Sequence, residues 1–139
     1  MKRNKRSRSM RRKTSFEKEI TVTFLEMLLM VKLFHWKTHS FATHKATDEL
    51  YYSLNEHVDK FIEVLLGKTG NRIDLMNHKT ISLIDLESTS KLKSKIEAFK
   101  SYLVSLTTNT SIMTNTDLLN IRDEILGDMN KFLYLLTFK

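Results

Sequence analysis

The stretch THKATDELYYSLNEHVDKFIEVLL, residues 43–66, decides the fold class, because its apolar residues recur at helical spacing. One face of a helix over this stretch collects Tyr51, Leu54, Val58, Phe61, Ile62 and Leu65. Gly67 follows directly, and glycine is a common residue at helix ends. The stretch therefore predicts an amphipathic helix that ends at Gly67.

Three more segments have the same periodicity and predict helices over about 15–38, 88–106 and 116–139. The first has one stripe of Ile20, Phe24, Met27, Val31 and Phe34, and a second stripe of Leu25, Leu28 and Leu29. Because a bundle core needs only one stripe, the second predicts burial against another subunit. The third helix is predicted from Leu92, Ile96, Phe99, Leu103 and Leu106, and the fourth from Leu118, Ile121, Ile125, Met129, Phe132 and Leu136.

The composition agrees with an all-α fold. The 139 residues include three glycines, no proline and no cysteine, which argues against a β-sandwich or barrel and excludes disulfides and thiolate metal sites. No glycines stand at the spacing of a phosphate-binding loop. We expect a four-helix bundle in which residues 68–88 cross over from one end to the other between the second and third helices.

The charge of the chain is concentrated at its start. The formal charge is +7, but residues 1–13 hold eight of the 23 basic residues and no acidic residue, which leaves 15 basic against 16 acidic residues. The eight are Lys2, Arg3, Lys5, Arg6, Arg8, Arg11, Arg12 and Lys13. Residues 1–14 are therefore predicted to be a disordered basic tail, and residues 15–139 the bundle. The expected partners of such a tail are nucleic-acid phosphates, an anionic membrane surface or a nuclear-import receptor, and its eight cations would bind duplex DNA without sequence preference.

Targeting and membrane interpretations are weaker. No apolar segment of suitable length follows the basic residues, so a secretory signal is not expected, and Arg11–Arg12 is a poor twin-arginine signal. The tail is rich in Arg and Ser, as mitochondrial transit peptides are, but it has no apolar face. No run of 18 apolar residues is present, and therefore no membrane-spanning segment is expected.

The residues that predict chemistry lie between positions 35 and 63. If His44 is set at zero on a helical wheel, Asp48, Asp59 and Glu63 follow at about 40°, 60° and 100°. His35 near the end of the preceding helix adds a second imidazole. Nitrogen and oxygen donors without sulfur suit iron, manganese or zinc. Each residue alone would be an ordinary core or surface residue more often than a ligand, but their joint order predicts a metal site.

The spacing of these residues imposes a condition on the site. Asp48 and Asp59 are separated by eleven residues, about 16 Å along a helix, so one chain cannot place all the donors around one ion cluster. Two copies can do so if their second helices pair antiparallel about a two-fold axis. An intrachain di-iron site of the Glu-x-x-His type is not expected, because no histidine has glutamate three residues before it.

The residues from about 24 to 66 resemble the Dps proteins, small ferritin-like proteins that protect DNA during starvation. His35-Trp36 resembles the family's His-Trp pair, and His44, Asp48, Asp59 and Glu63 match its ligand pattern in order. The resemblance implies a ferritin-like bundle that binds Fe(II) at a dimer interface and oxidises it with peroxide or oxygen. It also implies a twelve-subunit shell that stores mineral, and DNA binding by a basic tail. Similar ferritin-like proteins are encoded by large DNA viruses.

The sequence therefore predicts two alternative functions. The first is a Dps-like ferroxidase, soluble and intracellular, associated with DNA in a nucleoid or cytoplasm. The second is a non-enzymatic DNA-packaging or virion structural protein, in a virion or a nucleus, that uses the bundle and the tail. His39, His57 and His78 are assigned to neither, and surface or supporting roles are expected for them.

Overall fold

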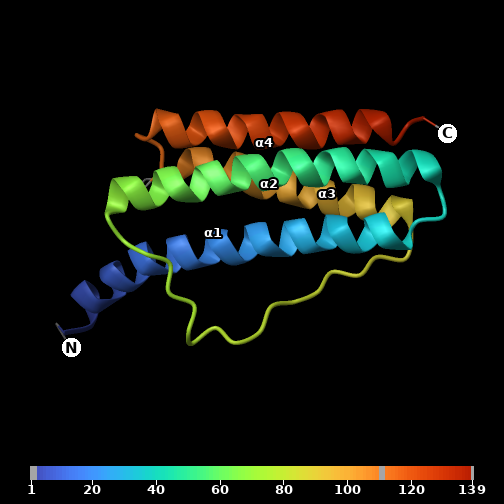
Figure 1. Ribbon diagram of the computed structural model, residues 1–139. Coiled ribbons are helices and arrows are strands. Elements are labelled where there is room, and N and C mark those ends of the chain that lie inside the picture. Colours follow the sequence, from blue (N-terminus) through green and yellow to red (C-terminus); the bar gives the residue numbers. More distant parts are fainter. Residues whose placement is uncertain (1–2, 110–111, 139) are drawn as a thin grey trace.

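The computed structural model describes residues 3–109 and 112–138, with residues 3–15 described by their backbone alone. In these ranges the chain forms four α-helices and no strand: α1 (Arg3–Lys37), α2 (Phe41–Thr69), α3 (Thr89–Ser105) and α4 (Thr116–Leu135). A 3₁₀ turn, η1 (Leu106–Thr108), follows α3. The all-α bundle predicted from the sequence is confirmed (Figure 1). No helix among the described residues is long and apolar enough to cross a membrane.

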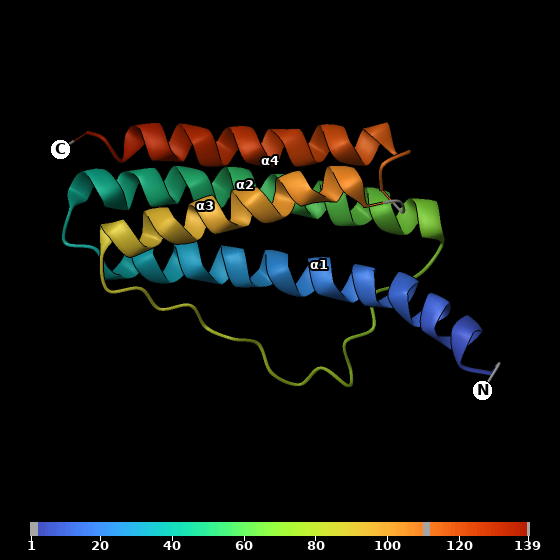
Figure 2. The ribbon, with the colours of Figure 1, turned by 180° about the vertical axis from the view of Figure 1, so that it is seen from behind.

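The helices form two antiparallel pairs, α1 with α2 and α3 with α4, and α2 also packs against α4 (Figures 1 and 2). Residues 70–88, here called the strap, connect α2 to α3 without a helix or strand, and they turn at 76–77, where the His78 N–H donates to the Leu75 carbonyl at 2.8 Å. Asn71, near the start of the strap, donates to the Glu17 carboxylate of α1 at 3.3 Å. Asp85, near its end, pairs with Lys37 at 2.8 Å. Because Glu17 and Lys37 lie 20 residues apart on α1, about 30 Å along its axis, the strap runs along that helix.

The core is built from the stripes that the sequence predicts. The first stripe of α1 is buried throughout, as are most of the predicted apolar positions of the other helices. The second stripe of α1 is divided: Leu28 is buried, whereas Leu25 and Leu29 are 41% and 37% exposed. These two side chains therefore remain available on the outer face of α1.

Two helix boundaries differ from the prediction. The helix α1 begins at Arg3 rather than near Ser15, so its backbone extends into the stretch predicted to be a tail. The helix α2 continues through Gly67 to Thr69 and ends at Gly70, which has φ 73° and donates its N–H to Leu66 at 2.8 Å. The left-handed conformation that glycine adopts without strain is needed at Gly70, while a glycine at position 67 is tolerated within the helix.

The predicted start of α3 is confirmed, because the Ser88 hydroxyl accepts from the Lys91 N–H as an N-cap. The other end of α3 is held by Arg122 of α4, whose side chain is buried. Its guanidinium donates to the Leu103 carbonyl and to the Thr107 hydroxyl, each at 2.8 Å. A cation at a helix C-terminus also interacts favourably with the helix dipole. Arg122 therefore joins the two helices of this pair.

Candidate metal centre

The two predicted imidazole ligands lie together at the turn between α1 and α2. The rings of His35 and His44 stack, with centroids 3.8 Å apart and planes 18° from parallel. His35 Nδ1 lies 2.8 Å from the His44 carbonyl oxygen, and His44 Nδ1 lies 2.9 Å from the His35 carbonyl oxygen. His35 is buried and His44 is exposed. The short connection between the helices thus brings together two residues that the sequence separates by nine positions.

These contacts determine which ring nitrogen can bind a metal. A carbonyl oxygen can only accept, so Nδ1 of each ring carries the proton. In a neutral ring Nε2 then has the free electron pair, which is the arrangement of most metal-bound histidines. The fully buried Thr47 adds a contact of 3.0 Å from its hydroxyl to His35 Nδ1. That hydroxyl also lies 2.8 Å from the Thr43 carbonyl oxygen, to which it donates.

Sequence reasoning missed Thr47. The available signal was a β-branched hydroxyl residue nearly two turns after the start of α2, on the side of the helix that faces α1. There it accepts from an imidazole and donates to its own helix backbone, so its polar atom is satisfied in the core.

The three predicted carboxylates lie on the exposed side of α2. Asp48 follows His44 by one turn, and Asp59 and Glu63 are one turn apart nearer the other end of the helix. A hydrogen bond with Asp59 and the negative charge of that residue raise the pKa of Glu63 above its usual range. Two adjacent carboxylates that repel each other in this way would be stabilised by a cation between them.

A single chain does not bring the two halves of the predicted site together. Within the described residues no group of three or more His, Asp and Glu side chains is placed to hold one metal ion. His35, His44 and Asp48 lie toward one end of α2, and Asp59 and Glu63 lie toward the other. One chain thus supplies two half-sites along the exposed side of α2, and His35 of α1 completes the first of them.

A second polar cluster, which the sequence did not predict, joins α2 to α4. His57 Nε2 lies 2.9 Å from the Glu124 carboxylate, and His57 Nδ1 lies 2.5 Å from the Asp128 carboxylate. Partial burial of Asp128 raises its pKa, and the hydrogen bond from His57 acts in the opposite direction. The two ring nitrogens point to different carboxylates, so this cluster ties helices together and is no second metal centre. Two acidic residues one turn apart on α4 were the only sequence signal for it.

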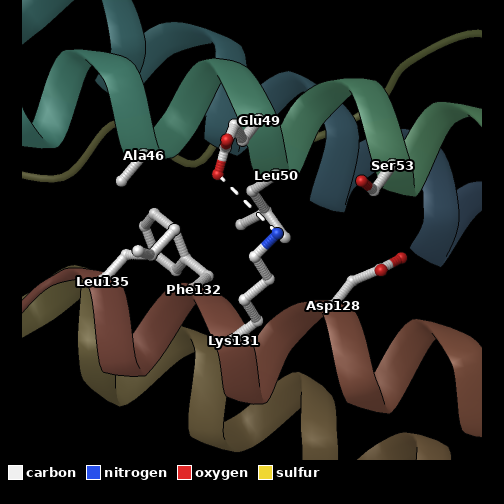
Figure 3. A pocket seen from close by; sticks show the side chains of 8 residues that line it. All are labelled: Ala46, Glu49, Leu50, Ser53, Asp128, Lys131, Phe132 and Leu135. Carbon is white, nitrogen blue, oxygen red and sulfur yellow. Dashed lines mark ion pairs between the residues drawn. The ribbon is translucent and has the colours of Figure 1, made fainter.

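A shallow pocket lies beside this cluster, between α2 and α4 (Figure 3). Its apolar side is formed by Ala46, Leu50, Phe132 and Leu135. Lys131 extends across the opening toward Glu49, at 4.0 Å. The cavity volume of about 20 Å³ is room for about one water molecule. This pocket therefore does not extend the candidate metal centre.

The remaining candidates stay apart from the centre. His39 and His78 are exposed, and neither side chain forms a hydrogen bond or ion pair with another described residue. The side chains of the eight basic residues predicted to bind DNA lie outside the part of the chain that the structure describes. The division of the chain at residue 14 therefore stays a prediction.

Comparison with known proteins assigns a family. The family model described as "Family of unknown function (DUF5856)" matches residues 35–136, most of the chain. The chain belongs to this family of unknown function. The match begins at His35 and includes both half-sites and the α2–α4 cluster. No curated protein and no solved structure matches the chain.

Proposed function

We propose that the protein is a Dps-like ferroxidase, which binds Fe(II) between two copies of the chain and oxidises it with peroxide or oxygen. The observation that carries this proposal is the orientation of His35 and His44, whose Nδ1 atoms are occupied by backbone carbonyls while Nε2 stays available. Asp48, Asp59 and Glu63 on the exposed side of the next helix supply the oxygen donors. Iron is the substrate of this reaction, and zinc or manganese would fit the same donors.

The proposed site is completed by a two-fold axis. His35, His44 and Asp48 of one protomer would face the partner's Asp59 and Glu63 across antiparallel α2 helices, giving two equivalent sites per dimer. The exposed Leu25 and Leu29 of α1 offer further apolar surface that a second copy could cover. A twelve-subunit shell that stores mineral is the larger assembly that the Dps resemblance suggests.

The proposed reaction requires the protein to bind Fe(II) and to orient the ligands. Two Fe(II) ions each lose one electron, and one peroxide accepts both electrons and two protons to give two water molecules. Neutral imidazole nitrogens and ionised carboxylates bind Fe(II) and favour Fe(III), because negative donors stabilise the higher charge. The protein's own contribution is to orient the ligands, which the reciprocal contacts of His35 and His44 achieve before any metal binds.

The path of the strap supports a ferritin-like topology with a crossover between the second and third helices. Its two anchors, Asn71 on Glu17 and Asp85 on Lys37, lie 20 residues apart on α1, about 30 Å along its axis. A connection that returns along a helix in this way lets α2 and α3 run in the same direction (Figures 1 and 2).

The basic tail carries the second part of the proposal, non-specific binding of duplex DNA. Eight cations within residues 1–13 would each displace counterions from phosphates, so affinity should fall steeply with salt. An oligomer that presents several tails gains avidity. Deletion of residues 2–13 should abolish DNA retention at low salt without changing Fe(II) oxidation, and retained binding would exclude the tail as the DNA-binding element.

The test of the enzyme is subunit complementation. His44→Ala and Asp59→Ala should each abolish rapid Fe(II) oxidation, while the helical content stays unchanged. After the two variants are unfolded and refolded together, half of the dimers pair one copy of each, and every such dimer regains one intact site. Activity should then return to about a quarter of the wild-type value. A mixture without activity would reject a shared site.

The competing function is a DNA-packaging or virion structural protein that needs no metal. It predicts background Fe(II) oxidation in the wild-type protein and DNA compaction that survives mutation of His44 and Asp59. Background Fe(II) oxidation would make the tail the main functional element, whereas DNA compaction that survives these mutations is expected under both functions.

A further inference from the structure

The strap is a long and apolar connection. It has 19 residues without a helix or strand. Loops of this length are uncommon in compact domains, where they are usually lids, binding loops or disordered segments. The large apolar residues of the strap are Ile73, Leu75, Met76, Ile81, Leu83, Ile84 and Leu86. A connection that only joined two helices through solvent would not need these side chains, so they indicate a surface that the strap can cover.

The two anchors of the strap lie on opposite flanks of α1. If the fully buried Ile20 is set at zero on a helical wheel, Glu17 lies at about 60° and Lys37 at about 260°. The strap cannot pass between these anchors through the core, so it crosses the outer face of α1. Leu25 at about 140° and Leu29 at about 180° lie on that line. These two leucines are therefore the apolar surface beneath the strap.

The ends of the strap are seated in this structure, whereas its middle is not. Ile84 and Leu86 pack against the hydrophobic core, and Ile73 and Leu75 are half-buried. Met76, in contrast, is 81% exposed, and the middle of the strap stands away from α1 (Figures 1 and 2). Apolar side chains on both sides, in the strap and on the face of α1 beneath it, are thus left in contact with water.

The strap is long enough to close onto α1. Fourteen residue steps separate Asn71 from Asp85, and a chain of that length can extend to about 48 Å. The two anchors are about 30 Å apart along the helix axis. If the strap advances evenly between them, Met76 lies at the height of residues 24–25 of α1. Closure can therefore bring Met76 to Leu25 without releasing either anchor.

We propose that the strap is a lid that closes onto the outer face of α1, with Met76 seated on Leu25 and Leu29 while both anchors stay in place. Methionine suits this position, because its flexible thioether adapts to irregular apolar surfaces. Closure removes apolar surface of both partners from water. The lid thereby controls access to the apolar face of α1. The inference goes beyond the proposed function and does not rest on it, because none of the proposed ligands lies in the strap.

A disulfide trap tests closure, because the chain has no cysteine of its own. Leu25→Cys/Met76→Cys is oxidised with diamide in EDTA at low protein concentration, and the disulfide within one chain is identified by mass. Met76→Cys/Ala98→Cys is the matched control, because Ala98 lies on the exposed side of α3. Since a disulfide needs Cα atoms about 4.4–6.8 Å apart, we expect the 25–76 disulfide to form at least about tenfold faster than the 76–98 disulfide. Equal rates would overturn the inference.

The cross-linked protein also reports what the lid covers. Anilinonaphthalene sulfonate, a dye that binds exposed apolar surface, should bind less to oxidised Leu25→Cys/Met76→Cys than to the reduced form of the same variant. Equal dye binding would show that closure covers no apolar surface, and it would overturn the inference.

A second measurement avoids cysteine. Lys79 is exposed in the middle of the strap, and a lysine-specific protease reaches it when the lid is open. Leu25→Ser/Leu29→Ser should raise the rate of cleavage after Lys79 at least about threefold, because the open form becomes more populated. The control Val104→Ser changes a 55% exposed apolar side chain of α3 and should leave the rate unchanged. An unchanged rate in the leucine variant would overturn the inference.

The lid and the ferroxidase fail separately. Rapid 25–76 cross-linking in a protein that does not oxidise Fe(II) supports the lid and rejects the ferroxidase. Successful complementation between His44→Ala and Asp59→Ala, with 25–76 cross-linking at the rate of the control, supports the shared site and overturns the lid.

Discussion

His35 and His44 are joined by two reciprocal hydrogen bonds, in which the Nδ1–H of each ring donates to the backbone carbonyl oxygen of the other residue. Their burial nevertheless differs, with His35 buried and His44 exposed. Both His35→Ala and His44→Ala should abolish rapid Fe(II) oxidation. Only His35→Ala should also lower the free energy of unfolding by about 1–3 kcal/mol, because it opens a cavity and removes a buried hydrogen bond. Urea unfolding measures the difference, and equal losses of stability in the two variants would contradict it.

Metal binding should drive dimerisation. In the proposed dimer Asp48 of one protomer faces the partner's Asp59, and carboxylates brought this close repel each other unless a cation lies between them. Zinc, which has no redox chemistry, should therefore lower the dimer dissociation constant at least about tenfold relative to EDTA. Asp59→Asn/Glu63→Gln should dimerise more tightly than the wild type in EDTA and lose its response to zinc. Sedimentation equilibrium measures both, and zinc-independent dimerisation of the wild type would exclude the coupling.

Arg122 should matter for stability more than any exposed ion pair. It is 8% exposed and donates to the Leu103 carbonyl, while its Nε contacts Asp123 at 2.7 Å. Arg122→Met keeps the apolar stem but leaves the end of α3 without its donor, so we expect a loss of about 2–4 kcal/mol in the free energy of unfolding. Asp123→Asn is the matched control and should cost less than about 1 kcal/mol, because Asp123 is exposed. Comparable losses in the two variants would locate the stabilisation in the ion pair.

Tyr102 should make the fold sensitive to alkali. Its hydroxyl oxygen is buried and makes no hydrogen bond of good geometry with another described residue, although the side chains of Thr23 and Glu19 lie near it. Burial, with a smaller contribution from the negative charge of Glu19, raises the pKa of Tyr102 to about 12. In the unfolded chain a tyrosine ionises near pH 10, so the free energy of unfolding should be unaffected below pH 10 and fall as the pH rises toward 12.

Tyr102→Phe should remove that part of the alkaline sensitivity and, at neutral pH, leave stability unchanged or raised by up to about 1 kcal/mol. Thermal unfolding at pH 7 and pH 11 provides the comparison. The phenolate absorbance near 295 nm should lose its latest-titrating component in the variant. A clear loss of stability at pH 7 would show that the hydroxyl has a partner after all.

The bundle could be predicted from the sequence because the buried side of each helix has apolar residues at a regular spacing of three and four. The stripe that includes Phe24 and Val31 is buried, and Ser88 caps α3 where its cluster of hydroxyl residues indicates. The sequence places the end of α2 at Gly67 rather than Gly70, since two glycines three residues apart give the same signal and only the backbone conformation separates them.

The positions of the proposed ligands along α2 could be predicted from the sequence, but the contacts around them could not. His44, Asp48, Asp59 and Glu63 share one helix, so their angular positions follow from helix geometry alone. The contacts of Thr47 with His35, and of His57 with Asp128, join different helices, and such contacts depend on packing angles that no local pattern encodes. The structure also leaves the pairing of two chains to experiment, because one chain holds each half-site separately.

The exposed middle of the strap is a point at which the chain could be cut into two helical pairs. It is pinned to α1 near both of its ends, whereas Met76 is 81% exposed and residues 76–80 are all exposed. A protease should therefore cut there first, and the nicked protein should stay assembled, because the cut removes no contact between helices. The α1–α2 fragment would contain the whole set of proposed ligands. The α3–α4 fragment would contain none of them and would contribute only the helices that pack against α2. Each helical pair could then be produced, labelled and varied separately before the two are recombined.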